Sequence, residues 1–362
     1  MDPNPLPNSN IPIQPPVTDL QPSPKGSAIR RHKYWILSAV ALIILLGTGG
    51  VLALIQKNAN QNKAIKSAAT SSLSKTKLAQ NTPTKPKKVS KVNLATLPLG
   101  DGRHTSIPKV GYITTCQTTF NDPGGAFQAG PWIDKSASTW DATKKLTVSG
   151  NVAWPSAKET ITESGSNLTV YTNALPNHRT GVFPIQSTDP AYQYDRNHST
   201  IAAQDFNFSF PLNPVAETSP GCIRGEVGVT LSGAILFDGF DAGGRDAVAW
   251  ELQDDCAGHP SSIYHYHGYS PCIPDSHGVN EHSALVGYAF DGFGIYGTQG
   301  EAGNELSTDD LDACHGHSHA VMWHGKTVTI YHYHMTRDFP YSVSCFKGKQ
   351  TLSGPLAKLP TQ

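Results

Sequence analysis

The sequence predicts a mainly β protein: a single β-rich domain, built from an internal duplication with pseudo-twofold packing, after an N-terminal transmembrane helix. Three observations predict this fold class. The chain of 362 residues has 33 glycines and 27 prolines, and it has few long amphipathic helical patterns. Short runs rich in β-branched and aromatic residues alternate with turn sequences. One set of motifs occurs twice in the same order, which indicates two similar units.

The first 95 residues are predicted to form three segments outside the folded domain. Residues 1–33 are rich in Pro and Asn, which is typical of a disordered tail. Residues 34–56 are the predicted transmembrane helix, because the stretch from Trp35 to Ile55 has no charge and can cross a bilayer. Residues 57–95 follow as a Lys/Ser/Thr-rich linker. We expect a single-pass cell-membrane protein with a cytoplasmic tail and an extracytoplasmic C-terminal domain; a cleaved signal peptide is the alternative.

Charge is unevenly distributed along the chain, although the formal net charge is zero. The linker has nine lysines and no acid between Lys57 and Lys91, whereas Asp and Glu outnumber Lys and Arg by 26 to 15 after residue 91. An acidic domain attracts cations and repels nucleic acid, so we expect no nucleic-acid partner. The linker is a candidate for contact with an anionic cell wall or lipid surface, with a plain spacer as the alternative.

The folded domain is predicted to span residues 96–350, with a tail at 351–362. Turn sequences separate its strands, for example Ser149-Gly150-Asn151. Two short helices are expected, at Arg245–Gln253 and at Ser307–Ala313, where Ser307 or Thr308 can cap the helix. The strands are expected at Val110–Thr119, Leu146–Trp154, Asn167–Asn173, Phe206–Phe210, Glu226–Phe237, Ile263–His267, Ala284–Phe290 and Lys326–His334.

The most informative motif is the tetrapeptide Tyr-His-Tyr-His, which occurs at residues 264–267 and again at 331–334. Side chains alternate between the faces of a strand, so both histidines of each copy share one face. Two imidazoles at this spacing can bind one metal ion. The predicted ligands are therefore His265, His267, His332 and His334. The alternative is an aromatic ladder with hydrogen-bonded histidines.

The repetition extends beyond the tetrapeptide. A Val-Gly pair recurs after 59 residues, a Cys-x-Gly-His motif after 58 and the tetrapeptide after 67, with a short insertion around residues 319–325. The repeat units are predicted at about 226–275 and 285–347. One unit is too small to bury a core by itself, so the two are expected to pack about a pseudo-twofold axis. Strands facing across that axis would bring four imidazoles to one shared centre.

Other histidines are further candidates for the metal site. His259 and His317 precede the two tetrapeptides at equivalent positions, where each can act as a ligand, orient a ligand or cap a turn. His178 is a candidate ligand or base. The segment with His315, His317, His319 and His324 is rich in histidine and is expected to lie at the periphery, where it can bind metal loosely.

Two acidic residues complete the candidate catalytic set with His178. Asp238 and Asp291 follow the two Val-Gly runs and are interpreted as corresponding positions. Either can orient a histidine, or act as a general base if burial raises its pKa. A structural role in an Asp-Gly turn is the alternative.

All six cysteines follow the apolar segment, which indicates disulfides formed in an oxidising compartment. The repeat suggests the pairs Cys256–Cys272 and Cys314–Cys345, which leaves Cys116–Cys222. Other connectivities stay open at this point. A Cys-ligated zinc site is the alternative, although the chain has no C-x-x-C motif.

The combination of the two tetrapeptides with Asp291-Gly292-Phe293 and Phe339-Pro340-Tyr341 resembles the YHYH domain family. Leu175-Pro176-Asn177-His178 is similar to an upstream block of that family, with Ala174 in place of the usual glycine. The resemblance covers roughly residues 165–348. The resemblance implies an extracytoplasmic domain. It does not specify a reaction.

We therefore expect a membrane-anchored extracytoplasmic domain that binds a transition metal, copper or zinc, through paired His-x-His strands. One alternative is a metal-dependent hydrolase or oxidoreductase. The other is a surface or cell-wall interaction module whose histidines only satisfy the core. The distances between the imidazoles distinguish these hypotheses, because ligands of one ion must converge.

Overall fold

The structure is a computed structural model that describes residues 92–117, 119–120, 122–277 and 281–351. The chain divides into two units, residues 1–84 and 85–362, and all described residues belong to the second. The predicted tail at 1–33, the transmembrane helix at 34–56, most of the linker and nearly all of the C-terminal tail lie outside the described residues. None of the helices in the described ranges is long and apolar enough to span a membrane.

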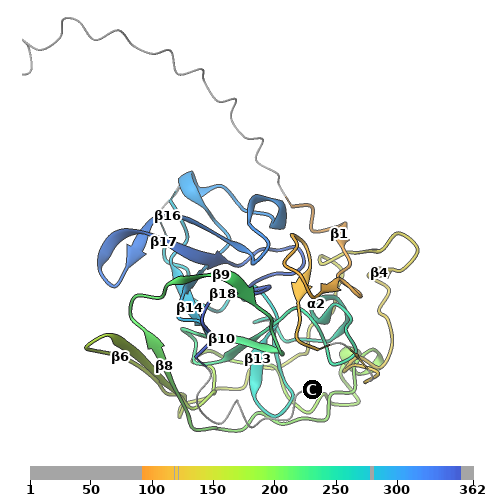
Figure 1. The fold of residues 1–362 in the computed structure, drawn as a ribbon. Coiled ribbons are helices and arrows are strands. Elements are labelled where there is room, and N and C mark those ends of the chain that lie inside the picture. The colour runs from red at the N-terminus through yellow and green to blue at the C-terminus, as the bar shows by residue number, and fades with distance from the viewer. Residues whose placement is uncertain (1–91, 118, 121, 278–280, 352–362) are drawn as a thin grey trace, which may run out of the picture. The chain divides into compact units, whose positions relative to one another are not determined.

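The described part of the chain is mainly β, as predicted, with its strands in five sheets (Figure 1). Its one α-helical turn is α2 (Ala247–Trp250), which the Asp246 carboxylate caps by accepting a hydrogen bond from the Ala249 N–H. The expected helix at Ser307–Ala313 is shorter than predicted and forms η3, with Ser307 in a capping box. The 3₁₀ helices are η1 (Pro190–Gln193), η2 (Glu301–Gly303) and η3 (Thr308–Asp310).

The largest sheet has eight strands in the order β12-β13-β11-β10-β14-β15-β17-β16. Figure 1 shows β16 and β17 at one end of it and β13 toward the other. The strand bounds are β10 (Glu226–Thr230), β11 (Ile235–Phe237), β12 (Gly258–Pro260), β13 (Tyr264–Tyr266), β14 (Leu285–Ala289), β15 (Gly294–Tyr296), β16 (Gly316–Trp323) and β17 (Lys326–His334).

The two halves of this sheet have matching pairings. At the centre β10 and β14 are antiparallel, with Val229 opposite Tyr288. On each side a parallel pair follows, β11 with β13 and β15 with β17. The outermost pairs are antiparallel, with His259 opposite His265 in one half and His317 opposite His332 in the other. Each tetrapeptide strand therefore has the same kind of neighbours.

Four strands separate β13 from β17 in this order. Neighbouring strands lie about 4.8 Å apart, so the two tetrapeptide strands are about 24 Å apart. They belong to one sheet, with those four strands between them, and do not bring their histidines together at one point. The sequence pattern identified both strands, but it carried no information on how many strands the sheet would insert between them.

Turns explain where the observed strands differ from the expected ones. The run at Glu226–Phe237 was expected to be one strand, but it forms β10 and β11, because the chain reverses at Gly233 (φ 86°). The segment around residues 319–325 was expected to be a peripheral insertion. It instead extends β16 and β17 and closes them with a two-residue turn at His324 and Gly325, both with positive φ.

Smaller sheets pack around the large one. β8 (Phe206–Pro211) buries alternate phenylalanines. The ring centroid of Phe208 lies 5.0 Å from that of Phe290, which directly follows β14 of the large sheet. The expected strands at Val110–Thr119 and Leu146–Trp154 are reduced to β3 and to isolated bridges, because these segments pair only briefly. The remaining strands are β1 (Leu97–Pro98), β2 (His104–Thr105), β3 (Ile113–Thr114), β4 (Ile133–Asp134), β5 (Thr139–Trp140), β6 (Glu159–Ser164), β7 (Asn167–Thr172), β9 (Ala216–Gly221) and β18 (Phe346–Gly348).

Three disulfides form with the predicted connectivity: Cys116–Cys222, Cys256–Cys272 and Cys314–Cys345. The first joins residues 106 positions apart, so it ties the segment before β4 to the chain that follows β9. The other two lie within the predicted repeat units and join residues 16 and 31 positions apart. The alternative of a Cys-ligated zinc site is wrong, because all six sulfurs are in disulfides.

Candidate functional site

One cluster of imidazoles, the first centre, lies at the β12–β13 end of the large sheet. It consists of His259, His265 and His267 together with the carboxylate of Glu251. The three rings are buried, and one nitrogen from each lies within 4.8 Å of the others. His265 and His267 come from the tetrapeptide strand, and His259 reaches them from β12 because it is directly opposite His265.

The hydrogen bonds of the first centre fix the tautomers of two rings. His265 donates from Nδ1 to the Ile263 carbonyl at 3.0 Å, and His267 donates from Nδ1 to the Asp238 carbonyl at 2.6 Å. A neutral imidazole has only one N–H, so both Nε2 atoms carry free lone pairs. These two Nε2 atoms are 3.1 Å apart. Neither can donate to the other, which makes the pair a set of converging ligand atoms.

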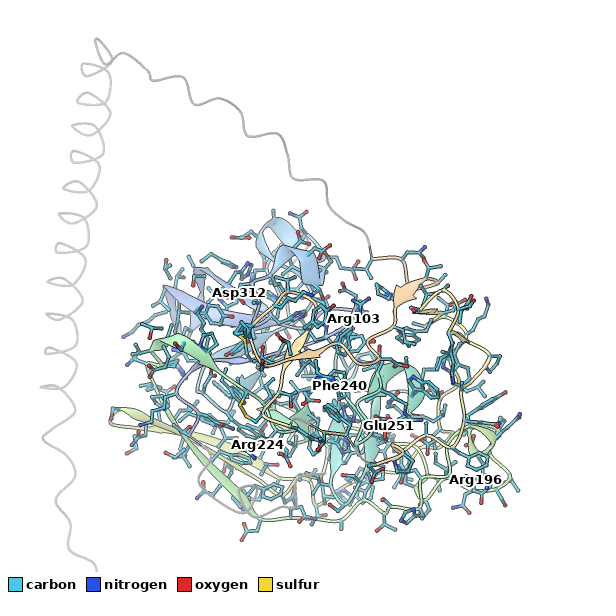
Figure 2. All side chains as sticks on the ribbon, turned by 45° about the vertical axis from the view of Figure 1, so that its right-hand side comes forward. Arg103, Arg196, Arg224, Phe240, Glu251 and Asp312 are labelled. Atoms are coloured by element: carbon cyan, nitrogen blue, oxygen red, sulfur yellow. A yellow bond between two sulfur atoms is a disulfide. The ribbon has the colours of Figure 1, made fainter. Side chains whose placement is uncertain are left out.

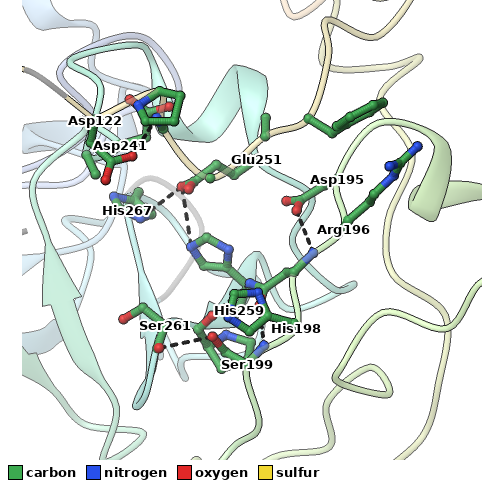
Figure 3. A pocket seen from close by; sticks show the side chains of 18 of the residues that line it. Asp122, Asp195, Arg196, His198, Ser199, Asp241, Glu251, His259, Ser261 and His267 are labelled. Atoms are coloured by element: carbon green, nitrogen blue, oxygen red, sulfur yellow. Dashed lines mark hydrogen bonds and ion pairs between the residues drawn. The ribbon is translucent and has the colours of Figure 1, made fainter.

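Glu251 brings a carboxylate to the same point. It follows α2 as the C-cap residue, and its Oε2 lies 3.5 Å from Nε2 of both His259 and His267. Figure 3 shows it between these two rings. Burial, reinforced by Asp241 and Asp195, raises the pKa of Glu251 well above its ordinary value. Oε2 is buried without a hydrogen-bond donor among the described residues.

A second cluster, the second centre, lies at the β16–β17 end of the sheet. Its five imidazoles come from the tetrapeptide strand, from β16 and from the segment before β14. One nitrogen from each lies within 4.8 Å of the others. Two of the rings are buried and three are half-buried. The members are His282, His317, His319, His332 and His334.

The second centre has the same tautomer arrangement. His334 donates from Nδ1 to the Gly297 carbonyl at 2.7 Å, and His282 donates from Nδ1 to the Ser283 carbonyl at 2.7 Å. Their Nε2 atoms, left without protons, are 3.1 Å apart. The Nε2 atoms of His317 and His319 are also 3.1 Å apart. His332 donates from Nδ1 to the Ile330 carbonyl, and its Nε2 has no hydrogen-bond partner in the described ranges.

The first centre opens into a cavity of about 560 Å³. His259, His265, His267 and Glu251 lie on its wall together with Ser261 (Figure 3). Figure 2 places Glu251 inside the molecule and Arg196, another lining residue, at its periphery. The three imidazoles therefore lie on the wall of a cavity, although each is almost fully buried.

Residues 207–308 match the family model of the YHYH protein family. The chain contains a YHYH domain. No curated protein and no solved structure matches the chain. The matched part of the YHYH domain includes the whole first centre and His282 of the second. The other four histidines of the second centre lie after it, between His317 and His334.

The expectation of one centre shared by both tetrapeptides is wrong. His265 and His267 belong to the first centre, and His332 and His334 to the second. The reason is the strand order, which places four strands between β13 and β17. His259 and His317 were further candidates, and the structure places one in each centre.

His178 joins neither imidazole cluster. Its Nε2 lies 2.5 Å from the Tyr266 hydroxyl, on the tyrosine side of β13. The potential ligands that lie with it are Cys256 and Cys272, which form a disulfide and offer no thiolate. His178 is therefore placed to hold a tyrosine of the first tetrapeptide strand.

The two acidic candidates have different surroundings and do not occupy corresponding positions. The Asp291 carboxylate accepts a 2.6 Å hydrogen bond from the Tyr333 hydroxyl. In the other half, the Ser232 hydroxyl lies 2.8 Å from the Tyr266 hydroxyl, so Ser232 is the counterpart of Asp291. Asp238 contributes its carbonyl to His267, as Gly297 does to His334. The Asp-Gly sequence that both residues share suggested a wrong correspondence. The separation of the two Asp-Gly pairs along the chain differs from the separation of the matching strands.

Three residues of the two centres were not among the predicted ligands: Glu251, His282 and His319. His319 carried a usable signal, because His317-Ser318-His319 repeats the His-x-His spacing of the tetrapeptides on a strand. Its place in a His-rich segment led to the expectation of a peripheral loop. Glu251 and His282 carry no local signal, since only tertiary packing brings them to the imidazoles.

Burial keeps these imidazoles neutral. It lowers the pKa of His265 to about 4 and that of His332 to about 3. In the metal-free protein we expect both rings to stay neutral, with the proton on Nδ1, at pH values where ordinary histidines titrate. Histidine ¹H–¹⁵N correlation spectra recorded from pH 7.5 to 4.5 measure this directly. A ring that protonates near pH 6.5 contradicts the expectation.

The sign of the linkage follows from the same shifts. The unfolded chain takes up a proton at each histidine near pH 6.5, and the folded His265 does so only near pH 4. This contributes up to about 3 kcal/mol toward unfolding as pH falls through that range. Burial raises the pKa of Asp238 and Asp246 to about 7. These carboxyls therefore take up protons more readily in the folded state, which stabilises the folded state as the pH falls from 7 to 4. Individual ring titrations are therefore more informative than a stability curve.

Proposed function

We propose that this YHYH domain is a transition-metal-binding domain with two separate centres, each suited to copper or zinc. The first centre would bind an ion through His259, His265, His267 and Glu251. The second would use its five imidazoles. Neutral imidazoles with one carboxylate form a donor set that these metals accept.

The observation that carries this proposal is the pair of close Nε2–Nε2 contacts between rings with fixed tautomers. Two such atoms, 3.1 Å apart in each centre, repel one another unless a cation lies between them. Ligands of one ion with metal–nitrogen bonds near 2.0–2.1 Å lie about 2.9–3.4 Å apart when adjacent. The observed separation falls within that range.

The backbone carbonyls around each centre further support a metal site. Metal-bound histidines usually donate their other N–H to a carbonyl or carboxylate, which fixes the ring and its tautomer. His265, His267, His282 and His334 all do so. The alternative of purely structural histidines is less well supported, because His259 has neither ring nitrogen hydrogen-bonded within the described residues.

Metal content of the purified full-length chain tests the proposal. After bound metal is removed and the protein is dialysed against Zn²⁺ or Cu²⁺, we expect elemental mass spectrometry to find two ions per chain. Zero ions after reconstitution would refute the proposal. One ion per chain would restrict it to a single centre, and the variants described in the Discussion identify which one.

We also propose that the two halves of the sheet arose by duplication, and that residues 34–56 anchor the domain outside the cytoplasm. The matching strand pairings support the first idea. Three disulfides support the second, because they persist in oxidising compartments. The Lys-rich linker is suited to an anionic wall or lipid surface. Protease digestion of intact cells tests the placement: protection of the domain before lysis would contradict it.

A further inference from the structure

We infer that the first centre binds an exogenous small molecule at the coordination position that Ser261 leaves open, and that this ligand is an uncharged or cationic molecule rich in hydrogen-bond donors. The inference rests on the proposed metal binding and adds a ligand to it. It also gives the two centres different roles: the first can bind an external ligand, whereas in the second the side chain of His319 occupies the corresponding position.

The spacing along the chain identifies that position, because Ser261 directly follows β12 in the turn that leads to β13. In the second centre His319 lies two residues after His317 and opposite Ile330 of β17. In the first centre Ser261 lies two residues after His259, and its N–H donates to the Ile263 carbonyl. Ile263 precedes His265 by two residues, as Ile330 precedes His332. Ser261 therefore stands where the second centre has an imidazole.

The side chains reflect this difference. His319 and His317 bring their Nε2 atoms to 3.1 Å. His259, the counterpart of His317, is only 3% exposed, and neither of its ring nitrogens has a hydrogen-bond partner within the described residues. Both His259 and Ser261 line the cavity of about 560 Å³. The position that an imidazole occupies in one centre is thus continuous with this cavity in the other.

The charge of the cavity wall selects the ligand. Four carboxylates line it, from Asp122, Asp195, Asp241 and Glu251, against one arginine, Arg196 (Figure 3). Part of this charge is compensated, since Asp241 pairs with Arg245 at 2.7 Å. With Glu251 bound to the ion and Asp241 paired with Arg245, Asp122 and Asp195 remain on the wall with Arg196. They provide acceptors for hydroxyl or ammonium donors, and away from the ion the wall has no surplus of cations that would favour an anion. Ser199 and Asn197 add polar groups to the same wall.

Exogenous imidazole is the direct probe, because it is uncharged and has the chemistry of the absent side chain. The full-length chain is loaded with Co²⁺, whose visible absorption reports its ligands, and titrated with imidazole and separately with azide. We expect a spectral change with imidazole, at a half-saturating concentration at least ten-fold lower than that for azide. Ser261→Ala serves as the matched control and should keep the response.

Ser261→His supplies the fourth imidazole within the chain. We expect this variant to bind Co²⁺ at the first centre more tightly and to lose the response to imidazole. Ser261→Leu, which fills the space without adding a ligand, keeps the test available if the histidine variant does not fold; it should bind Co²⁺ and lose the response. An unchanged response in either variant, or tighter binding of azide than of imidazole, would overturn the inference.

Cobalt content, measured in the same samples, separates the two proposals. A chain that takes up no Co²⁺ contradicts the metal-binding function itself. A chain that binds Co²⁺ but shows no response to imidazole in either the unmodified or the Ser261→Ala form contradicts only the open position.

Discussion

Replacing His267 with alanine should remove the metal ion from the first centre and leave the second centre loaded. His267 donates to the Asp238 carbonyl, and its Nε2 lies 3.1 Å from His265 Nε2 and 3.5 Å from Glu251 Oε2. Its Nε2 is thus close both to an imidazole nitrogen and to a carboxylate oxygen of the proposed ligand set. Loss of partners that only orient a ligand lowers metal affinity about 10- to 100-fold, so loss of the ligand should cost about 100-fold or more.

The same variant should lose much of the stabilisation that metal gives. An ion present at about 1,000 times its dissociation constant stabilises the folded state by about 4 kcal/mol. Urea unfolding with and without a chelator measures this difference, and elemental analysis counts the remaining ions. The metal-free forms of the variant and the unmodified chain must be compared as well, because alanine also leaves a cavity in the buried site.

Two variants serve as controls for this result. His334→Ala makes the matching change in the second centre and should reverse the outcome, with the first centre loaded and the second empty. His178→Ala removes a histidine that contacts Tyr266 and lies in neither cluster, so the metal count should stay at two. If His267→Ala and His334→Ala each abolish both ions, the two centres are not independent and the proposal of two sites is wrong.

Removing the Cys116–Cys222 disulfide should lower the free energy of unfolding by about 4–5 kcal/mol. The bond joins residues 106 positions apart, and a crosslink restricts the unfolded chain more when it closes a longer loop. The native contacts beside it are backbone hydrogen bonds, from Cys116 N–H to the Ile223 carbonyl and from Ile223 N–H to the Thr114 carbonyl. These can persist in the Cys116→Ala/Cys222→Ala variant, so the fold should survive.

The Cys256→Ala/Cys272→Ala variant is the matched control. Its disulfide spans only 16 positions, so its loss should cost less, about 3 kcal/mol. Urea unfolding curves of the three proteins give the comparison, with the metal removed so that binding does not contribute. A loss for the long loop that is no greater than for the short one would show that strain or residual structure, rather than loop length, controls these bonds.

Local patterns predicted several elements of the fold well. The strand at Lys326–His334 was expected with the bounds that β17 has, and the strand at Phe206–Phe210 differs from β8 by one residue. Both have strong β-branched or aromatic patterns. Glu226–Phe237 was less predictable, because the reversal at Gly233 interrupts an otherwise continuous apolar run. Elements such as β6 and β12 were missed, since their sequences are polar or short and only their partners make them strands.

The candidate site was predicted in part for the same reason. The alternation of strand side chains determined that His265 would share a face with His267, and His332 with His334. The repeat also suggested His259 and His317. It could not identify Glu251, which lies next to the imidazoles because α2 packs beside the first centre, nor His282, which reaches the second centre from the segment before β14.

The sequence by itself determined that this protein would be mainly β and that histidines would lie in pairs along two strands, and its repeat suggested which cysteines would join. These features depend on neighbours in the chain or on a repeat that can be read directly. Only the tertiary structure decided that the pairs form two centres and that one of them opens into a cavity. Strand order and packing are set by contacts between distant residues, and these contacts placed four strands between the tetrapeptides and the first centre on the wall of the cavity.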